Sequence, residues 1–210
     1  MVYNIGMNAV PSPGQLEFPF SAGRLCLDFT GTVGQRSAWG YERLREPADL
    51  GRWVVQAGLL ERTPRCDEAA LSVARDLREA IYLSLSAVIS GRPASGQDVA
   101  AINKAASWLP RVPQLDPRTR QVSWVCARPL RAGLATVARD AVLLLGSDDI
   151  QRVRECAAAD CSLLFLDSSR SGRRRWCSME RCGNRQKTAS YRRRRSEVMP
   201  GPGARGESGH

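Results

Sequence analysis

Apolar and small side chains recur with a helical period along most of residues 47–145. The longest such run covers residues 67–90 and ends before Gly91 and Pro93, which are residues that stop helices. Its inward positions follow the 3.6-residue period of an amphipathic helix. They are Ala70, Val73, Ala74, Leu77, Ala80, Ile81, Ser84 and Val88. This pattern predicts one long helix with a single face packed in a core.

Shorter helices are predicted on both sides of this one. They cover residues 47–58, 97–108, 129–145 and 147–154, and Ser147 is the expected cap of the last. Residues 24–29 are also apolar, but periodicity alone leaves open whether they form a strand or begin a helix. Three prolines then exclude a long helix between residues 110 and 117.

The segment with these prolines has the pattern of a β-hairpin. Residues 112–115 and 120–126 would be its strands, joined by the turn Asp116-Pro117-Arg118-Thr119. Together these segments predict a mainly α protein of the α+β kind, with a helical N-terminal domain that contains one hairpin.

Composition changes at both ends of this helical part. Residues 1–20 lack periodicity and are expected to be a flexible lead-in, and residues 21–150 form the helical domain. Residues 151–195 are expected to be a separate small unit. Residues 196–210 form a Gly/Pro/Ser-rich tail that is predicted to be disordered.

The net charge of +10 is concentrated in one part of the 210-residue chain. Residues 1–150 hold 17 basic and 15 acidic side chains, whereas residues 151–195 hold 13 basic and 4 acidic ones. A local excess of this size is typical of a protein that binds a polyanion. Arg outnumbers Lys by 29 to 2, and a GC-rich genome would also enrich Arg. That alternative does not by itself explain why the net charge is concentrated.

Other features limit the class of protein. The longest uninterrupted apolar run, near residues 141–145, is too short to cross a bilayer, and residues 1–20 do not resemble a secretory signal. We therefore expect no membrane partner and a cytoplasmic, nucleoid-associated location with reduced thiols. The single histidine is His210, so most acid–base mechanisms lack their usual group and we expect no enzyme. The carboxylates of Asp28, Asp76 and Glu79 are more simply helix or cap residues.

Seven cysteines fall into two groups. Cys26, Cys66 and Cys126 are scattered and are expected to be buried thiols. The other four form two C-x4-C pairs with fifteen residues between them. They are Cys156, Cys161, Cys177 and Cys182. Such pairs predict one structural Zn²⁺ held by four thiolates, because a site with four protein ligands has no open position for catalysis. Disulfides and a coincidental spacing are the alternatives.

The spacer between the cysteine pairs predicts the shape of this unit. Residues 163–167 are expected to be a strand, residues 168–172 a turn and residues 173–176 the returning strand. A helix should begin near Ser178 and place Cys182 in or just before its first turns. A cysteine knuckle, a hairpin and a helix together make a treble-clef-like finger, which has few large apolar residues and is expected to fold around its metal.

Basic side chains surround the predicted finger and continue along its helix. Such a helix suits a major groove or a phosphate backbone, and a solvated helix or an arm for RNA or acidic proteins is the alternative. Part of the arginine excess would compensate the charge of the thiolates. The candidate nucleic-acid-binding residues are Arg170, Arg173, Arg174, Arg175, Arg181, Asn184, Arg185, Lys187, Arg192, Arg193, Arg194 and Arg195.

These residues resemble a known family. Residues 156–161, 164–167 and 174–179, followed by Cys182-Gly183-Asn184-Arg185, are similar to the CGNR zinc finger, which is named for that tetrad. Residues 25–34, 47–50 and 77–82 resemble, more weakly, the ABATE domain that commonly precedes it. One departure is Gly31, where that family usually has Asn before a Thr-Val pair.

The resemblance implies a bacterial, stress-induced transcription regulator that binds double-stranded DNA through its finger and holds zinc at the four cysteines. The N-terminal domain would then sense a small-molecule signal or form a homodimer. A zinc-stabilised module that binds protein or RNA, without sequence-specific DNA binding, is the alternative.

Overall fold

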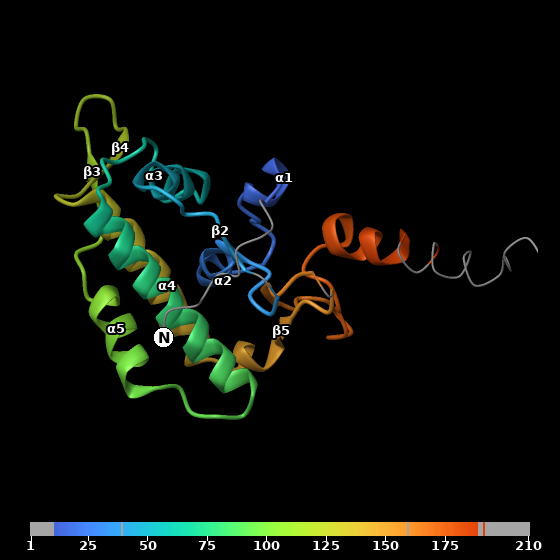
Figure 1. The fold of residues 1–210 in the computed structure, drawn as a ribbon. Coiled ribbons are helices and arrows are strands. Elements are labelled where there is room, and N and C mark those ends of the chain that lie inside the picture. Colours follow the sequence, from blue (N-terminus) through green and yellow to red (C-terminus); the bar gives the residue numbers. More distant parts are fainter. Residues whose placement is uncertain (1–10, 39, 159, 189–190, 192–210) are drawn as a thin grey trace, which may run out of the picture.

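The computed structural model describes residues 11–38, 40–158, 160–188 and 191. Figure 1 shows a helical body on one side and a smaller unit on the other, from which the last described helix projects. The predicted Arg192, Arg193, Arg194 and Arg195, the tail at 196–210 and the first ten residues lie outside the described residues.

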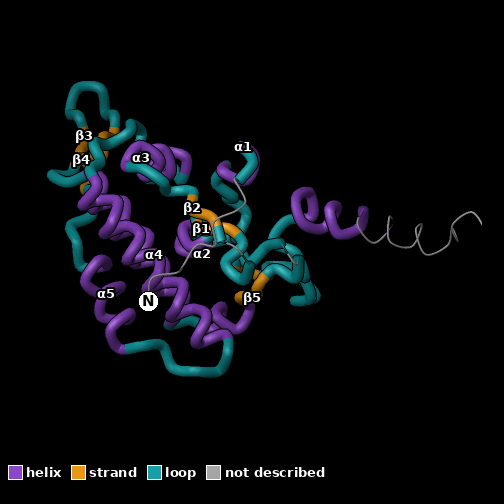
Figure 2. Tube along the Cα trace, viewed as in Figure 1, coloured by secondary structure: helices purple, strands orange, loops and turns teal. Residues whose placement is uncertain are grey.

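Four helices make up most of the body. They are α3 (Pro47–Gln56), α4 (Glu68–Ile89), α5 (Gly96–Ala106) and α6 (Pro129–Leu145). Each buries an apolar stripe, and α5 and α6 pack against each other and against α4. The predicted helices at 47–58, 67–90, 97–108 and 129–145 are confirmed, with ends that differ by at most two residues. The mainly α, α+β fold class is confirmed as well, and Figure 2 shows how short the strands are.

The segment that the periodicity left open is helical. It forms α2 (Leu25–Thr30), and Cys26, Leu27 and Phe29 are fully buried. Its N-terminus is held by Asp140 of α6, whose Oδ2 accepts the Cys26 N–H at 2.9 Å. Arg24 completes the contact with an ion pair of 2.8 Å to the same carboxylate. Tertiary contacts with α6 therefore decide the conformation of this short apolar run.

The strands form three separate antiparallel pairs. β1 (Val33–Gly34) pairs with β2 (Tyr41–Glu42), and the predicted hairpin is confirmed as β3 (Val112–Leu115) and β4 (Val122–Val125). The third pair joins β5 (Val153–Glu155) to β6 (Leu164–Leu166). The predicted strand at 173–176 was wrong, because β6 pairs with the segment before the first cysteine and not with the one after the turn.

Two smaller predictions also need correction. The expected helix at 147–154 is a short 3₁₀ turn, η1 (Asp148–Arg152), because Val153 already begins β5. Of the three scattered cysteines only Cys26 is buried, whereas Cys66 and Cys126 are partly exposed. A short helix α1 (Pro13–Leu16) precedes α2, and Phe18 packs on the core beside it. The packed region therefore begins before residue 21.

One apolar core runs through both parts of the chain. Phe29 and Trp53 lie at its centre, with ring centroids 4.8 Å apart, and Leu164, Phe165 and Cys177 belong to the same cluster. Among the described residues, no helix is both long enough and apolar enough to cross a membrane. The small unit is thus packed onto the helical domain through shared apolar side chains.

Candidate metal centre and basic surface

Four cysteine sulfurs gather in the small unit at residues 152–188. The Sγ atoms of Cys156, Cys161, Cys177 and Cys182 all lie within 4.8 Å of one another. Cys177 is the centre of the group, with its Sγ 3.8 Å from that of Cys161 and 3.5 Å from that of Cys182. These distances are far longer than a disulfide bond, and all seven cysteines of the chain are free thiols.

This geometry fits a tetrahedral zinc ion. Zn–S bonds of about 2.3 Å give a tetrahedron with sulfur–sulfur edges of about 3.8 Å. The four thiols also compete for protons: hydrogen bonds from Cys161 and its neighbours lower the pKa of Cys156, and the bond to Cys156 raises the pKa of Cys177. A divalent cation resolves this competition because it stabilises all four as thiolates. The chain holds one structural zinc at these residues.

The β5–β6 hairpin brings the first cysteine pair together. Cys156 follows β5 and donates its N–H to Leu163 O at 2.9 Å, and Cys161 donates its N–H to Ala158 O at 2.9 Å. These two bonds close a tight knuckle with both thiols on its inner side. The Cys177 N–H lies 3.4 Å from Cys156 Sγ and directs the second pair towards the first.

A helix positions the second pair. Ser178 caps it by accepting the Arg181 N–H, and Met179–Gly183 form a wide first turn that continues as a helix through Thr188. The Cys182 N–H bonds to Ser178 O at 3.0 Å, so the thiol lies in this first turn. The predicted helix start near Ser178 and the place of Cys182 are confirmed.

Asp167 organises the loop between the pairs, and sequence reasoning did not single it out. Its side chain accepts the Ser169 hydroxyl at 2.6 Å, the Ser169 N–H at 2.9 Å and the Arg174 N–H at 2.8 Å. The Ser169 hydroxyl and these N–H groups lower the pKa of Asp167. An Asp followed by two serines is a common turn signal, and it could have identified this role.

Two predicted nucleic-acid contacts have partners inside the finger. Arg174 donates to the carbonyls of Trp176 and Cys177, and its guanidinium lies over the Phe165 ring. Arg185 pairs with Asp160 at 3.0 Å and lies 3.5 Å from Cys182 Sγ. Arg174 thus braces the second knuckle, and Arg185 contributes positive charge beside a thiolate.

The other predicted nucleic-acid-binding residues that the structure describes point outward. Arg170, Arg173, Arg175, Arg181, Asn184 and Lys187 are exposed. Within the described part of the chain, no hydrogen bond or ion pair engages the side chains of Arg170, Arg173 or Lys187, whereas Arg175 stacks on Trp176. The exposed cations therefore lie on two features, the 168–173 loop and the helix after Ser178.

The finger is fastened to the helical domain by three kinds of contact. Leu166 N–H bonds to Ala22 O at 2.8 Å, and Ser162 Oγ accepts the Arg36 N–H. Gly31 lies so close to Leu163 that an added Cβ would be 2.5 Å from Leu163 Cδ2. A side chain at position 31 would therefore require Leu163 to shift.

A cleft of about 260 Å³ remains between the two parts. Gln35, Tyr41 and Arg43 from around β1 and β2 form one wall, and Cys161 and Cys177 contribute to the other. The metal centre therefore faces the helical domain across this cleft and is not an isolated appendage.

Comparison with known families gives two matches. A family model named ABATE, described as "Putative stress-induced transcription regulator", matches residues 23–148, and the CGNR zinc finger model matches residues 152–195. A search of curated proteins finds none that matches the chain. The two matches cover the helical domain and the four-cysteine unit. The chain therefore belongs to the ABATE family and carries a CGNR zinc finger after that domain.

Proposed function

We propose that this protein is a transcription regulator that binds double-stranded DNA through the CGNR finger. The observation that carries the proposal is the concentration of exposed cations on the finger. Residues 151–195 hold 13 of the 31 basic side chains of the chain and 4 of its 21 acidic ones. Among the described residues, the zinc centre and the shared core hold Arg170, Arg173 and Lys187 on a fixed scaffold, which lowers the entropy cost of binding a regular polyanion.

The two basic features suit different parts of a duplex. The helix after Ser178 projects from the body in Figure 1 and presents Asn184 and Lys187 to solvent. A helix of this kind fits a major groove, where Asn can bond an adenine edge. Arg170 and Arg173 lie on the loop before it and would contact phosphates, which fix the register of a protein on DNA.

The proposed contact surface is smaller than the full set of basic residues. Arg174 and Arg185 already serve the finger, so their loss would weaken DNA binding through the metal centre and not through a lost phosphate contact. Arg192, Arg193, Arg194 and Arg195 would extend the surface beyond the described helix. Membership of the ABATE family supports a role in transcription regulation. The same proposal includes a response to stress or to a small molecule. It also includes homodimer formation through the helical domain.

We assign no catalytic step to the helical domain. Asp28 accepts the Ala22 N–H at 2.9 Å, and Glu79 is occupied by Arg36 and Arg78 at 2.6 and 2.8 Å. Asp76 is exposed on α4. The carboxylates considered as acids or bases therefore have structural partners or face open solvent.

A salt series tests the proposal on the full chain with zinc bound. Affinity for a duplex of random sequence, measured by fluorescence anisotropy, should fall steeply with salt. Each phosphate contact contributes about −0.9 to the slope of log K against the logarithm of the salt concentration. Removing zinc with a chelator should abolish this binding. Selection of bound genomic fragments should then recover a shared sequence motif.

Paired variants give the contrast. The double variant Arg170→Ala/Arg173→Ala should lose about two phosphate contacts. The slope of log K against log salt should therefore become shallower by about 2. Arg62→Ala with Arg92→Ala removes the same charge from exposed positions of the helical domain and should leave the slope unchanged. If zinc-loaded protein does not bind duplex DNA but binds RNA or an acidic protein, the interaction-module alternative replaces this proposal.

A further inference from the structure

Arg43 is an unusual buried charge. It follows β2 in the helical domain, and only 4% of its surface is exposed. Its guanidinium donates to Glu17 O, Gly31 O and the Tyr41 hydroxyl, each at 2.8 Å. All three acceptors are neutral. They engage three of the five N–H groups of the guanidinium but carry no negative charge to balance it, and an unbalanced buried charge is costly.

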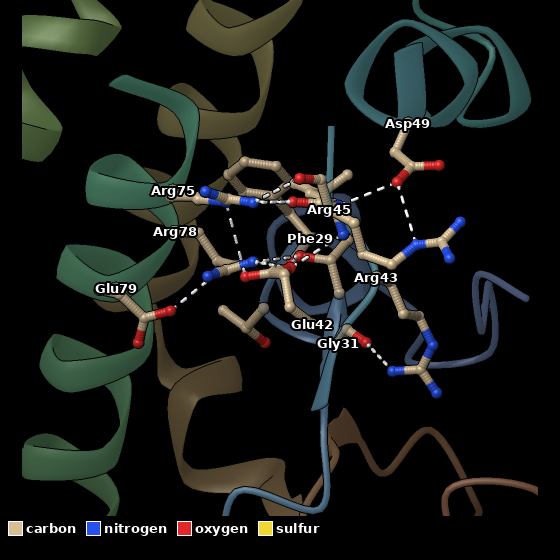
Figure 3. Close-up of polar contacts among 12 residues, drawn as sticks. Phe29, Gly31, Glu42, Arg43, Arg45, Asp49, Arg75, Arg78 and Glu79 are labelled. Atoms are coloured by element: carbon tan, nitrogen blue, oxygen red, sulfur yellow. Dashed lines mark hydrogen bonds and ion pairs between the residues drawn. The ribbon is translucent and has the colours of Figure 1, made fainter. Parts of the chain in front are cut away.

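The nearby carboxylates are bound to other arginines. Glu42 pairs with Arg78 at 2.7 Å, and Asp49 pairs with Arg45 and Arg52. Figure 3 shows Arg43 extending towards Gly31 and away from these carboxylates. Among the described residues, no carboxylate lies within ion-pair distance of Arg43.

The metal centre lies across the cleft that Arg43 lines. Cys161, Cys177 and Cys182 contribute to the same cleft. Four thiolates around Zn²⁺ carry a net charge of −2, which follows from the charges of the ion and its ligands. Burial lowers the pKa of the Arg43 guanidinium and Arg181 adds to that shift, whereas Tyr41 and Cys161 oppose it. Arg43 and three of the four thiolates thus line the same cleft, and opposite charges on facing walls attract each other.

We propose that Arg43 is the counter-charge that the helical domain supplies to the zinc–thiolate centre of the finger. Zinc binding and the seating of the finger on the helical domain are then coupled. Arg185 also faces the sulfurs, but it is half exposed and shared with Asp160. Of Arg43 and Arg185, Arg43 is the positioning residue, because three hydrogen bonds within the helical domain hold its guanidinium.

The coupling predicts a specific change in zinc affinity. Arg43→Gln removes the charge and should weaken zinc binding by the full chain about tenfold, the low end of the effect of residues that support metal ligands. Arg43→Lys keeps the charge and loses hydrogen bonds, so it should lower the melting temperature but keep the zinc affinity near that of the unchanged chain. Competition with a chromophoric zinc chelator measures both affinities.

Arg139→Gln is the matched control. Like Arg43, Arg139 of α6 donates to neutral acceptors, the carbonyls of Ala106 and Trp108, at 2.8 and 2.6 Å. Its loss should lower the stability of the zinc-bound and zinc-free forms equally and leave zinc affinity unchanged. A purely structural Arg43 would behave in the same way, so unchanged zinc affinity in Arg43→Gln would overturn the proposal. Equal weakening by Gln and Lys would also overturn it, because the charge would then not be the cause.

The unchanged chain gives a second test that does not depend on a variant folding. On zinc removal, amide hydrogen exchange should speed up at residues 41–43 as well as in the finger, while α5 keeps its rates. Faster exchange confined to the finger would show that the helical domain does not respond to the metal charge, and the proposal would fail.

Discussion

The helical domain and the finger reach stability in different ways. The helical domain buries several large apolar side chains of its own, among them Trp53, Phe29 and Ile81. In the finger, Phe165 is the large side chain that is fully buried, and it packs into the core of the other domain. The rest of the finger depends on four thiols that need a cation. The comparison teaches that this finger is stabilised by its metal and by a neighbour, and is not an autonomous module.

Loss of the metal should produce the largest difference between the two regions. Cys177→Ser should abolish zinc binding, duplex binding and protection of residues 168–188 from hydrogen exchange, because structural zinc contributes on the order of 10 kcal/mol in small fingers. The helical circular dichroism signal of the protein should largely remain, because α4 and α6 contribute much of it. Cys126→Ser is the control and should keep its zinc. A Cys177→Ser protein with unchanged salt-dependent binding would contradict the zinc-finger assignment.

Loss of the shared core should weaken both regions together. Phe165→Ala should lower the free energy of unfolding by about 3–5 kcal/mol, since a large aromatic side chain leaves a cavity. Urea denaturation followed by circular dichroism would measure the change. Leu115→Ala on the exposed β3–β4 hairpin should change it little, because that side chain is 64% exposed. An effect confined to zinc affinity would mean that the finger folds independently.

The contact at Gly31 should give a smaller effect. Gly31→Asn should cost about 1–3 kcal/mol, because the added Cβ forces Leu163 from its place and Asp28 O, 3.2 Å away, limits the adjustment. Combining it with Leu163→Ala should recover part of that loss in a double-mutant cycle. Additive losses in the cycle would show that the two residues do not share the contact.

The last prediction concerns pH. Burial raises the pKa of Asp28 from 3.8 to about 6. Between these values the folded state binds a proton that the unfolded state lacks, so stability falls as pH rises through this window and then levels off. Zinc binding releases protons from the cysteines, so the finger gains stability with pH. In the zinc-free protein, Asp28→Asn should remove the fall of the unfolding free energy with pH, measured by urea denaturation at several pH values. The same fall in both proteins would contradict this prediction.

Local sequence signals predicted most elements because their reasons are local. The helices α3, α4, α5 and α6 have strong periodicity and clear stops, and Pro117 with its neighbours indicated the hairpin turn. The four zinc ligands were predicted because two C-x4-C pairs with a hairpin-length spacer are typical of a thiolate zinc site when thiols stay reduced. The helix start near Ser178 was predicted from the pattern of the finger, and in the structure the Ser178 side chain caps that helix.

The failures concern partners that the local sequence pattern does not identify. The strand expected at 173–176 does not form. β6 pairs instead with β5, the segment before Cys156. Arg174 looked like a surface cation, but two carbonyls and an aromatic ring engage it within the fold. Arg185 is exposed and also lies beside Cys182 Sγ, in line with the expectation that part of the arginine excess compensates the thiolates. Nothing in the local pattern distinguishes Arg174 from Arg170 or Arg173.

The sequence by itself determined the helices, the cysteine set and the concentration of positive charge, because each depends on the identity and spacing of nearby residues. Only the tertiary structure decided which arginines remain exposed, where Phe165 packs and which charge Arg43 faces. These outcomes depend on how the folded chain places side chains relative to one another, as when it brings Arg43 and Cys161, 118 positions apart, to the lining of one cleft.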